Sequence, residues 1–261
     1  YGSGRQGHVA VSDVDLVVPT GQVVGLVGES GSGKSTLARA AVGLVAPAAG
    51  KIVLDGEPVP RRGRRPLQMV FQDPYASLDP RMTAGESIAE AIPRSGPAAI
   101  AGRAVRHAKA AELTDLVGLL PGTADRHPAG LSGGQRQRVA LARALAGAPR
   151  VLIADEITSA LDVSTQGAVL NLIRDLQREL GLSMLFISHN LAVVRYVADI
   201  VAVMYQGRIV EHGPAGDVLA EPRHAYTRRL LAAVPRPGSK LDATPEPADD
   251  EETAPPTRRS S

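Results

Sequence analysis

The chain of 261 residues contains no cysteine and no tryptophan, and aromatic residues make up only 3% of it. The absence of cysteine excludes a disulfide framework, a cysteine zinc site and an iron–sulfur cluster. The scarcity of aromatic rings removes the stacking platforms on which single-stranded nucleic acids bind. Apolar runs break at glycine, proline or charge within about a dozen residues, short of the ~18 that a membrane-spanning helix needs. Chemistry at any site must therefore use oxygen and nitrogen groups.

An excess of charge of one sign is also lacking, since 29 basic residues face 27 acidic ones. This balance argues against nucleic acid as the main partner. The one basic run, RRGRR at residues 61–65, fits a solvated loop better than a lipid or nucleic-acid patch. The chain starts at Tyr1 without a methionine, from which we expect a segment of a longer polypeptide.

The apolar patterns predict an α/β fold. Residues 9–28 predict an antiparallel flap that turns at residues 19–21 and leads into a buried strand, VVGLVG, and residues 51–56 predict another short strand. Apolar runs at 151–155 and 184–188 each follow a helical stretch, which is the pattern of a parallel sheet with helical crossovers. We therefore expect a mostly parallel sheet with flanking helices and an antiparallel β subdomain.

The remaining segments predict a helical insert, a hairpin and a tail. Residues 73–150 contain an amphipathic stretch and no convincing strand between the parallel runs. Residues 200–213 predict a hairpin that turns at Gln206 and Gly207, followed by a short helical stretch to about Ala233. From Pro235 the chain is rich in proline, acid and serine, so we expect residues 235–261 to be disordered.

Residues 28–36 read GESGSGKST between a predicted strand and a helical run, which is the context of a phosphate-binding P-loop. Glycines let successive backbone N–H groups converge on phosphate oxygens, and the helix N-terminus adds positive potential. Lys34 is expected to reach the β- and γ-phosphates and Ser35 to bind Mg²⁺. The residues expected to contact the nucleotide here are Gly28, Ser30, Gly31, Ser32, Gly33, Lys34, Ser35 and Thr36.

Residues 151–156, VLIADE, predict a buried strand that ends in two carboxylates. If this strand neighbours the P-loop strand, as doubly wound sheets allow, both carboxylates lie near the phosphates. Asp155 then orients Mg²⁺ through its water shell, and Glu156 faces the γ-phosphate as a general base or water-positioning group. Charged strand ends are common in α/β proteins, so this interpretation depends on the P-loop.

A third motif, LSGGQ at residues 131–135, precedes a helical run. Ser132 is the predicted N-cap, and the glycines leave the helix N-terminus open to a phosphate. Together with the P-loop, VLIADE and a histidine after the next strand, LSGGQ resembles the nucleotide-binding subunit of an ATP-binding cassette (ABC) transporter. The resemblance implies a P-loop NTPase core in a cassette of residues 1–234, with a helical subdomain at about 74–146.

The resemblance also implies roles for further residues. Gln72 matches the Q-loop glutamine that contacts Mg²⁺ and the attacking water, so that Gln72 joins Ser35 and Asp155 as a metal residue. His189 matches the switch histidine at the γ-phosphate, and Asp162 ends the SALD of the D-loop at the dimer interface. Tyr1 stands at a spacing compatible with the aromatic that stacks on adenine. The implied catalytic residues are Glu156, His189, Gln72 and Lys34.

In this family two cassettes meet head to tail, so the LSGGQ of one closes over ATP held by the P-loop of the other. The resemblance thus implies ATP and Mg²⁺ as cofactors and a second cassette, in the same fused chain or separate, as partner. It also implies transmembrane permease subunits, indirectly an extracytoplasmic solute-binding protein, and a peripheral location on the cytoplasmic face of the cell membrane. The residues expected to reach the partner's nucleotide are Ser132, Gly133, Gly134 and Gln135.

The strings VFQDPYASLDPRMT and EPRHAYTRRLLAAVP resemble the oligopeptide/dipeptide/nickel importer branch, with a C-terminal extension at about 214–234. Peptide import is therefore the expected function, and nickel or another small solute is the alternative. The chain departs from the branch at Ile157, Asn190 and Ala225, where proline, aspartate and proline are usual. None of these changes removes a group that contacts phosphate.

Two other functional classes fit the sequence less well. DNA-maintenance ATPases share these motifs but insert long coiled-coil arms between the Q-loop and the signature, whereas here about 60 residues without sustained heptads separate Gln72 from Leu131. A regulatory half-site that does not hydrolyse ATP is disfavoured, because the polar residues that hydrolysis needs are all present.

Overall fold

The computed structural model describes residues 9–60, 66–95 and 99–233. Its centre is a six-stranded sheet with the order β4-β5-β6-β1-β7-β8, in which only the β7–β8 pair is antiparallel. The expected mostly parallel sheet is confirmed. The strands are β1 Val23–Val27, β4 Leu67–Val70, β5 Val151–Asp155, β6 Ser183–Ile187, β7 Ile200–Tyr205 and β8 Arg208–Pro214.

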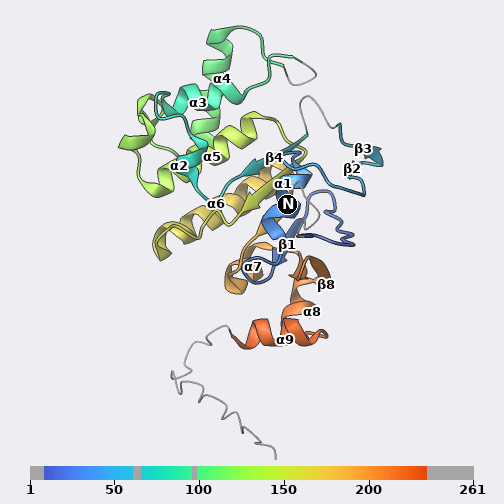
Figure 1. The fold of residues 1–261 in the computed structure, drawn as a ribbon. Coiled ribbons are helices and arrows are strands. Elements are labelled where there is room, and N and C mark those ends of the chain that lie inside the picture. The colour runs from blue at the N-terminus through green and yellow to red at the C-terminus, as the bar shows by residue number, and fades with distance from the viewer. Residues whose placement is uncertain (1–8, 61–65, 96–98, 234–261) are drawn as a thin grey trace, which may run out of the picture.

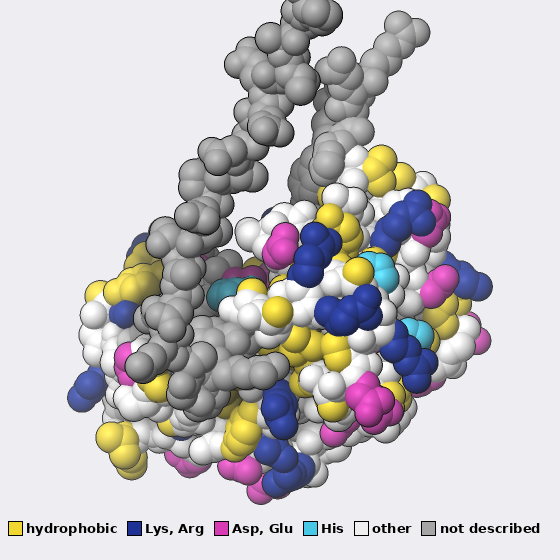
Figure 2. Space-filling view, turned by 90° about the horizontal axis from the view of Figure 1, so that it is seen from below, with side chains coloured by type: hydrophobic (Ala, Val, Ile, Leu, Met, Phe, Trp, Pro, Cys, Tyr) yellow, Lys and Arg dark blue, Asp and Glu magenta, His cyan; other side chains and the backbone are white. Residues whose placement is uncertain are grey.

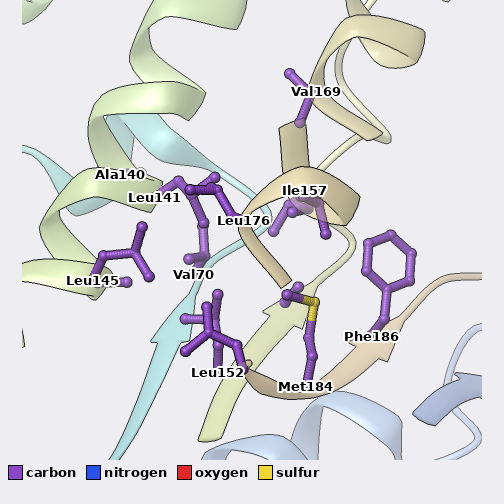
Figure 3. Close-up of a cluster of buried hydrophobic side chains, with 14 of the residues drawn as sticks. Val70, Ala140, Leu141, Leu145, Leu152, Ile157, Val169, Leu176, Met184 and Phe186 are labelled. Atoms are coloured by element: carbon purple, nitrogen blue, oxygen red, sulfur yellow. The ribbon is translucent and has the colours of Figure 1, made fainter. Parts of the chain in front are cut away.

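Helices cover both faces of this sheet, which explains why β1, β5 and β6 are buried along their whole length and mostly apolar, apart from Asp155 at the end of β5 and Ser183 at the start of β6. One face packs against α1 (Lys34–Ala41), and the other packs against α6 (Val163–Leu180) and α7 (Leu191–Val197). Figure 3 shows the second cluster, in which Leu176 of α6 and Met184 of β6 lie among the labelled apolar side chains. The packed core therefore keeps the carboxyl ends of the parallel strands together at one end of the sheet.

A separate group of helices lies above the sheet in Figure 1, between β4 and β5 in the sequence. The structure describes helices and short 3₁₀ turns, but no strand, in the parts of residues 74–146 that it covers. These elements are α2 Pro74–Ser77, α3 Ala84–Ala91, α4 Arg103–Leu116, η1 Thr123–Asp125, η2 Pro128–Gly130 and α5 Gly133–Ala146.

One strand prediction is wrong. The structure assigns no strand to residues 9–18, and the expected antiparallel element is the short pair β2 (Val53–Leu54) and β3 (Glu57–Pro58). Val14, Leu16 and Val18 do turn alternately toward the core, where they pack beside the α1 face. The alternation reports packing on one side, whereas a strand also requires a neighbouring backbone ladder.

The hairpin prediction is confirmed. β7 and β8 pair antiparallel across Gln206 and Gly207, whose positive φ values of 47° and 79° match the turn that favours tight hairpins. Two short helices follow, α8 (Ala215–Ala220) and α9 (Ala225–Ala232), at the lower end of Figure 1. The basic run 61–65 and the tail predicted from Pro235 lie outside the described residues.

The surface reflects the balanced composition. On the face that Figure 2 views, basic and acidic side chains are interspersed among the described residues. No helix in the described part of the chain is both long and apolar enough to cross a bilayer.

Gly167 is expected to lower the free energy of unfolding relative to alanine at the same position. Gly167 lies exposed within α6, and an added Cβ meets no atom within 4 Å. We expect Gly167→Ala to raise the free energy of unfolding by about 0.5–1 kcal/mol, because alanine loses less backbone entropy in a helix. Urea denaturation measures this change.

Gly25→Ala is the matched control, since its Cβ would lie 2.4 Å from Val194 Cγ1 in α7. This variant is expected to be less stable than the wild type. Unchanged or reduced stability of Gly167→Ala would contradict the first expectation.

Candidate functional site

The loop between β1 and α1 requires glycine at two close approaches. Gly28 has a φ of 153°, and an added Cβ would lie 2.2 Å from the Met204 carbonyl oxygen in β7. Gly33 has a φ of 108°, and its Cβ would lie 2.5 Å from the Ala10 carbonyl oxygen. Because side chains are excluded at both positions, the loop backbone packs directly against β7 at Gly28 and against the segment that contains Ala10 at Gly33.

Lys34 begins α1 and is buried beneath this loop. Its Nζ donates hydrogen bonds to the carbonyl oxygens of Gly28 and Glu29, each at 2.8 Å. Burial lowers the Lys34 pKa, while the carboxylates of Glu156, Asp155 and Glu29 oppose this effect. An ammonium group held by backbone oxygens can turn toward an anion that binds at the loop. Ser30 and Gly31 are exposed beside it, and Thr36 is half-buried in α1.

Ser35 Oγ donates a hydrogen bond to Asp155 Oδ1 at 3.1 Å, which joins the start of α1 to the end of β5. The premise that β5 neighbours β1 is wrong, because β6 lies between them. The two groups still meet since α1 packs against β5. Asp155 is only 4% exposed, and burial raises its pKa although the Ser35 hydrogen bond acts in the opposite direction.

This pair fits the chemistry of Mg²⁺. A hydroxyl and a carboxylate are hard oxygen ligands, and Mg²⁺ commonly takes one or two protein oxygens together with substrate phosphates and water. The described residues include no group of three His, Cys, Asp or Glu side chains that could hold a metal alone. Among the described residues no lysine or arginine forms a hydrogen bond with the buried Asp155 carboxylate, so a bound cation would stabilise its charge.

Glu156, His189 and Gln72 come together because they follow β5, β6 and β4, which are neighbours in the sheet. His189 Nδ1 lies 3.4 Å from Glu156 Oε2, whose side chain is 18% exposed. Gln72 Nε2 lies 3.5 Å from Ser159 Oγ, and Ser159 Oγ donates to the Glu156 carbonyl oxygen at 2.9 Å. Glu156 has a positive φ of 48°, a strained conformation that occurs often at functional sites.

The LSGGQ residues lie at the start of α5. Ser132 is the N-cap, as predicted, and forms a reciprocal capping box with Gln135. Gly134 packs against α6, where an added Cβ would lie 2.5 Å from Thr165 Cγ2, and Gly133 approaches Leu161.

Asp162 caps the neighbouring α6. Hydrogen bonds from Ser164 Oγ and from the Thr165 backbone and hydroxyl hold the Asp162 pKa well below its usual range. Among the described residues no hydrogen bond or ion pair joins Ser132 or Asp162 to Lys34 or Asp155. Two groups of site residues thus exist, one on the sheet and one between α5 and α6. Tyr1 lies outside the described residues.

The three departures from the family pattern have local explanations. Asn190 caps α7 by accepting hydrogen bonds from the backbones of Ala192 and Val193, a role that aspartate fills equally well. Ile157 is 2% exposed and belongs to the core cluster of Figure 3. Ala225 begins α9, where proline is tolerated but not required.

Sequence reasoning missed one link between the motifs. The Arg136 guanidinium donates to Tyr75 Oη at 2.7 Å and to the Leu131 carbonyl oxygen at 2.6 Å, and it lies 3.8 Å over the Tyr75 ring. Tyr75 is three residues past Gln72, so this contact joins the Q-loop segment to the signature helix. The only signal in the sequence was an arginine directly after LSGGQ.

A groove of about 470 Å³ borders this region. Its walls come from β4 with the following Phe71, from the end of α3, and from α5. Arg143 lies at its edge and bonds the Ser77 carbonyl oxygen at 2.6 Å. The groove therefore lies directly beside the segment that carries Gln72.

Asp155→Asn tests whether the Ser35–Asp155 pair binds Mg²⁺. The variant keeps the size of the side chain and removes its charge, so we expect the Mg²⁺ concentration for half-maximal ATP hydrolysis to rise about tenfold or more. Asp175→Asn, at an exposed position of α6, is the control and should behave as wild type. Equal Mg²⁺ dependence of Asp155→Asn and wild type contradicts the assignment.

Comparison with known proteins gives two family matches. Residues 11–159 match the model described as ABC transporter, and residues 210–258 match the model described as oligopeptide/dipeptide transporter, C-terminal region. A putative peptide import ATP-binding protein of Brucella ovis is 50% identical over 234 residues, which cover 87% of this chain and 73% of that protein. The oligopeptide transport ATP-binding protein OppD of Mycobacterium tuberculosis is 49% identical over 235 residues, covering 87% of this chain but 38% of OppD.

Solved structures give the same result. A dimeric structure of MJ0796, titled as a bacterial ABC transporter cassette, has a TM-score of 0.72 at 29% identity and covers 82% of this chain and 94% of that one. A dimeric post-hydrolysis state of MJ0796 bound to ADP and Pi has a TM-score of 0.71 at 30% identity, with the same coverage.

Proposed function

Because the chain belongs to the ABC transporter family, we propose that it is the ATP-binding and ATP-hydrolysing subunit that energises import of peptides. The observation that carries this proposal is the meeting of Lys34, the Ser35–Asp155 pair and Glu156 at the carboxyl ends of the parallel strands. Peptide as the substrate class is supported by the match of residues 210–258 and by the relatives named for peptide import.

Each group has a distinct role in hydrolysis. Lys34 binds the β- and γ-phosphates, together with N–H groups of residues 30–36 at the start of α1. Ser35 and Asp155 would hold Mg²⁺, with Gln72 beside them, and the bound ion would neutralise charge on the phosphate oxygens. Glu156 accepts a proton from the attacking water, and His189 lies beside it at the γ-phosphate.

A second cassette completes this site. The separation of the Ser132–Asp162 group from the Lys34 group supports a head-to-tail arrangement, in which residues 132–135 of one cassette cover the nucleotide of the other. The exposed start of α5 then neutralises γ-phosphate charge only when ATP is present. ATP thus favours the closed dimer and hydrolysis favours its opening.

The domain division and the other partners follow from this arrangement. We assign residues 1–234 to the cassette, 74–146 to its helical subdomain, 214–234 to the importer extension and 235–261 to a tail. Permease subunits at the cytoplasmic face of the membrane fit the groove beside Gln72, and a solute-binding protein acts through them. Tyr1 is assigned to the adenine.

The test is transport by the reassembled complex. The chain is purified with its permease subunits, placed in proteoliposomes, and supplied with ATP, Mg²⁺, a solute-binding protein and labelled di- to pentapeptides. ATP-dependent peptide uptake is expected. Uptake of Ni²⁺ but not of peptide would favour the nickel alternative, and nucleotide binding without hydrolysis would favour a regulatory half-site.

A further inference from the structure

We infer that Tyr226 of α9 is a positioning residue for the P-loop, which it holds through a hydrogen bond from the backbone N–H of Glu29 to its hydroxyl. The two atoms are 2.9 Å apart. Glu29 follows Gly28 directly and is the first residue of the loop after β1. This inference rests on the proposed ATP site, and it extends that site to the C-terminal region.

The Tyr226 ring is held in place by burial and by stacking on a second tyrosine. Its side chain is 2% exposed, and its ring centroid lies 4.1 Å from that of Tyr205, with an angle of 31° between the planes. Tyr205 is the last residue of β7, the strand that pairs with β1. Burial raises the Tyr226 pKa, so the hydroxyl stays neutral and accepts the Glu29 hydrogen bond at physiological pH.

The turn that leads into α9 is fixed as well. The Glu211 carboxylate of β8 accepts hydrogen bonds from the backbone N–H groups of Arg223 and His224, at 2.8 and 2.9 Å. Burial raises the pKa of Glu211, but the neighbouring Thr227 side chain and these two backbone donors outweigh it and lower the pKa, so the carboxylate stays ionised. His224 Nδ1 in turn accepts from the Tyr226 backbone N–H at 3.2 Å, which caps α9.

The loop needs this support most when Lys34 leaves it. In the structure the Lys34 ammonium donates hydrogen bonds to the carbonyl oxygens of Gly28 and Glu29. Once Lys34 turns to phosphate, the Gly28 and Glu29 carbonyl oxygens lose their hydrogen bonds to the ammonium. The hydrogen bond from the Glu29 N–H to the Tyr226 hydroxyl does not involve Lys34 and can remain. Gly207 of the hairpin turn provides a parallel contact, since its N–H donates to the Ser32 carbonyl oxygen at 2.9 Å.

Preorganisation explains how such a contact affects ATP affinity. A loop already in its binding conformation loses less conformational freedom when the ligand binds. Removing the hydroxyl leaves the Glu29 N–H without its partner and permits other loop conformations, which weakens ATP binding. The groups that perform hydrolysis are untouched, so turnover at saturation should change little.

Tyr226→Phe tests the inference in the full-length chain, with Tyr205→Phe as the matched control. Phenylalanine keeps the packed ring and removes only the hydroxyl, and the Tyr205 hydroxyl contacts the Gln206 side chain rather than the P-loop. We expect Tyr226→Phe to raise the KM for ATP about three- to tenfold, the effect of one hydrogen bond, with kcat within about twofold of wild type. Tyr205→Phe should leave KM unchanged.

Amide hydrogen exchange provides a second measurement, in which the wild type tests the hydrogen bond directly and the amides of β5 and β6 report whether the variant is folded. The Glu29 amide should be protected in the wild-type protein and should exchange faster in Tyr226→Phe, while amides of β5 and β6 keep their protection. An unprotected Glu29 amide in the wild type overturns the inference, as does an unchanged KM or a loss confined to kcat. If the wild type does not bind ATP, the proposed function fails, but the exchange of Glu29 still tests the hydrogen bond.

Discussion

Replacing Glu156 with glutamine is expected to slow ATP hydrolysis by at least about 100-fold and to leave ATP binding intact. Glutamine keeps the shape of the side chain but cannot accept a proton from water. The effect should be specific to this position, since Glu156 directly follows Asp155 at the end of β5 and its Oε2 lies 3.4 Å from His189 Nδ1. Steady-state phosphate release and equilibrium binding of ATP, measured on the same preparation, separate the two effects.

Glu179→Gln is the control for this variant. It makes the same chemical change at an exposed position at the end of α6, and it should hydrolyse ATP at the wild-type rate. The head-to-tail model adds a further expectation. In the presence of ATP, Glu156→Gln should accumulate as a dimer, whereas the wild-type dimer should open again after hydrolysis. Wild-type turnover in Glu156→Gln would remove this residue from the proposed role.

Replacing Lys34 with alanine is expected to abolish ATP binding and with it the proposed ATP-dependent dimer. Lys34 is the one lysine of the P-loop, its ammonium donates to the loop carbonyls of Gly28 and Glu29, and the charges of Glu156 and Asp155 raise its pKa against the effect of burial. Without it, the triphosphate faces Asp155 and Glu156 with one opposing charge fewer. Light scattering with and without ATP measures the dimer, and calorimetry measures binding.

Two companion variants separate this effect from loss of fold. Lys34→Met keeps the aliphatic stem buried and removes the charge, so it should also fail to bind ATP while its thermal unfolding stays close to wild type. Lys51→Ala removes an exposed lysine outside the motif and should bind ATP normally. Persistence of the ATP-dependent dimer in both Lys34 variants contradicts the role of this residue.

The strand and motif predictions succeeded where the signal was local. The buried runs VVGLVG and VLIAD form β1 and β5, since a strand covered on both faces is apolar throughout. The strand prediction for residues 9–18 was wrong because their alternation arises from packing on one side, and no described segment pairs with them as a strand. No pattern within a segment reveals whether another segment supplies the ladder.

The site divides in the same way. Gly28, Lys34 and Ser35 lie within one short motif, so their chemistry could be predicted from their spacing. The contacts of Arg136 with Tyr75 and of Tyr226 with Glu29 join residues far apart in the chain, and no local signal announces them. Asp155 is an intermediate case. Its position near the P-loop was predicted correctly, but from a mistaken strand order.

The sequence by itself determined which chemical groups are available, because glycine, lysine, hydroxyl and carboxylate in fixed local spacing dictate how a triphosphate can be bound. Only the tertiary structure decided which of these groups meet. β6 separates β1 from β5, and α1 reaches Asp155 by packing over the sheet, since strand order depends on how distant apolar faces are buried together. The same packing brought α9 to the back of the P-loop, which residue spacing alone does not encode.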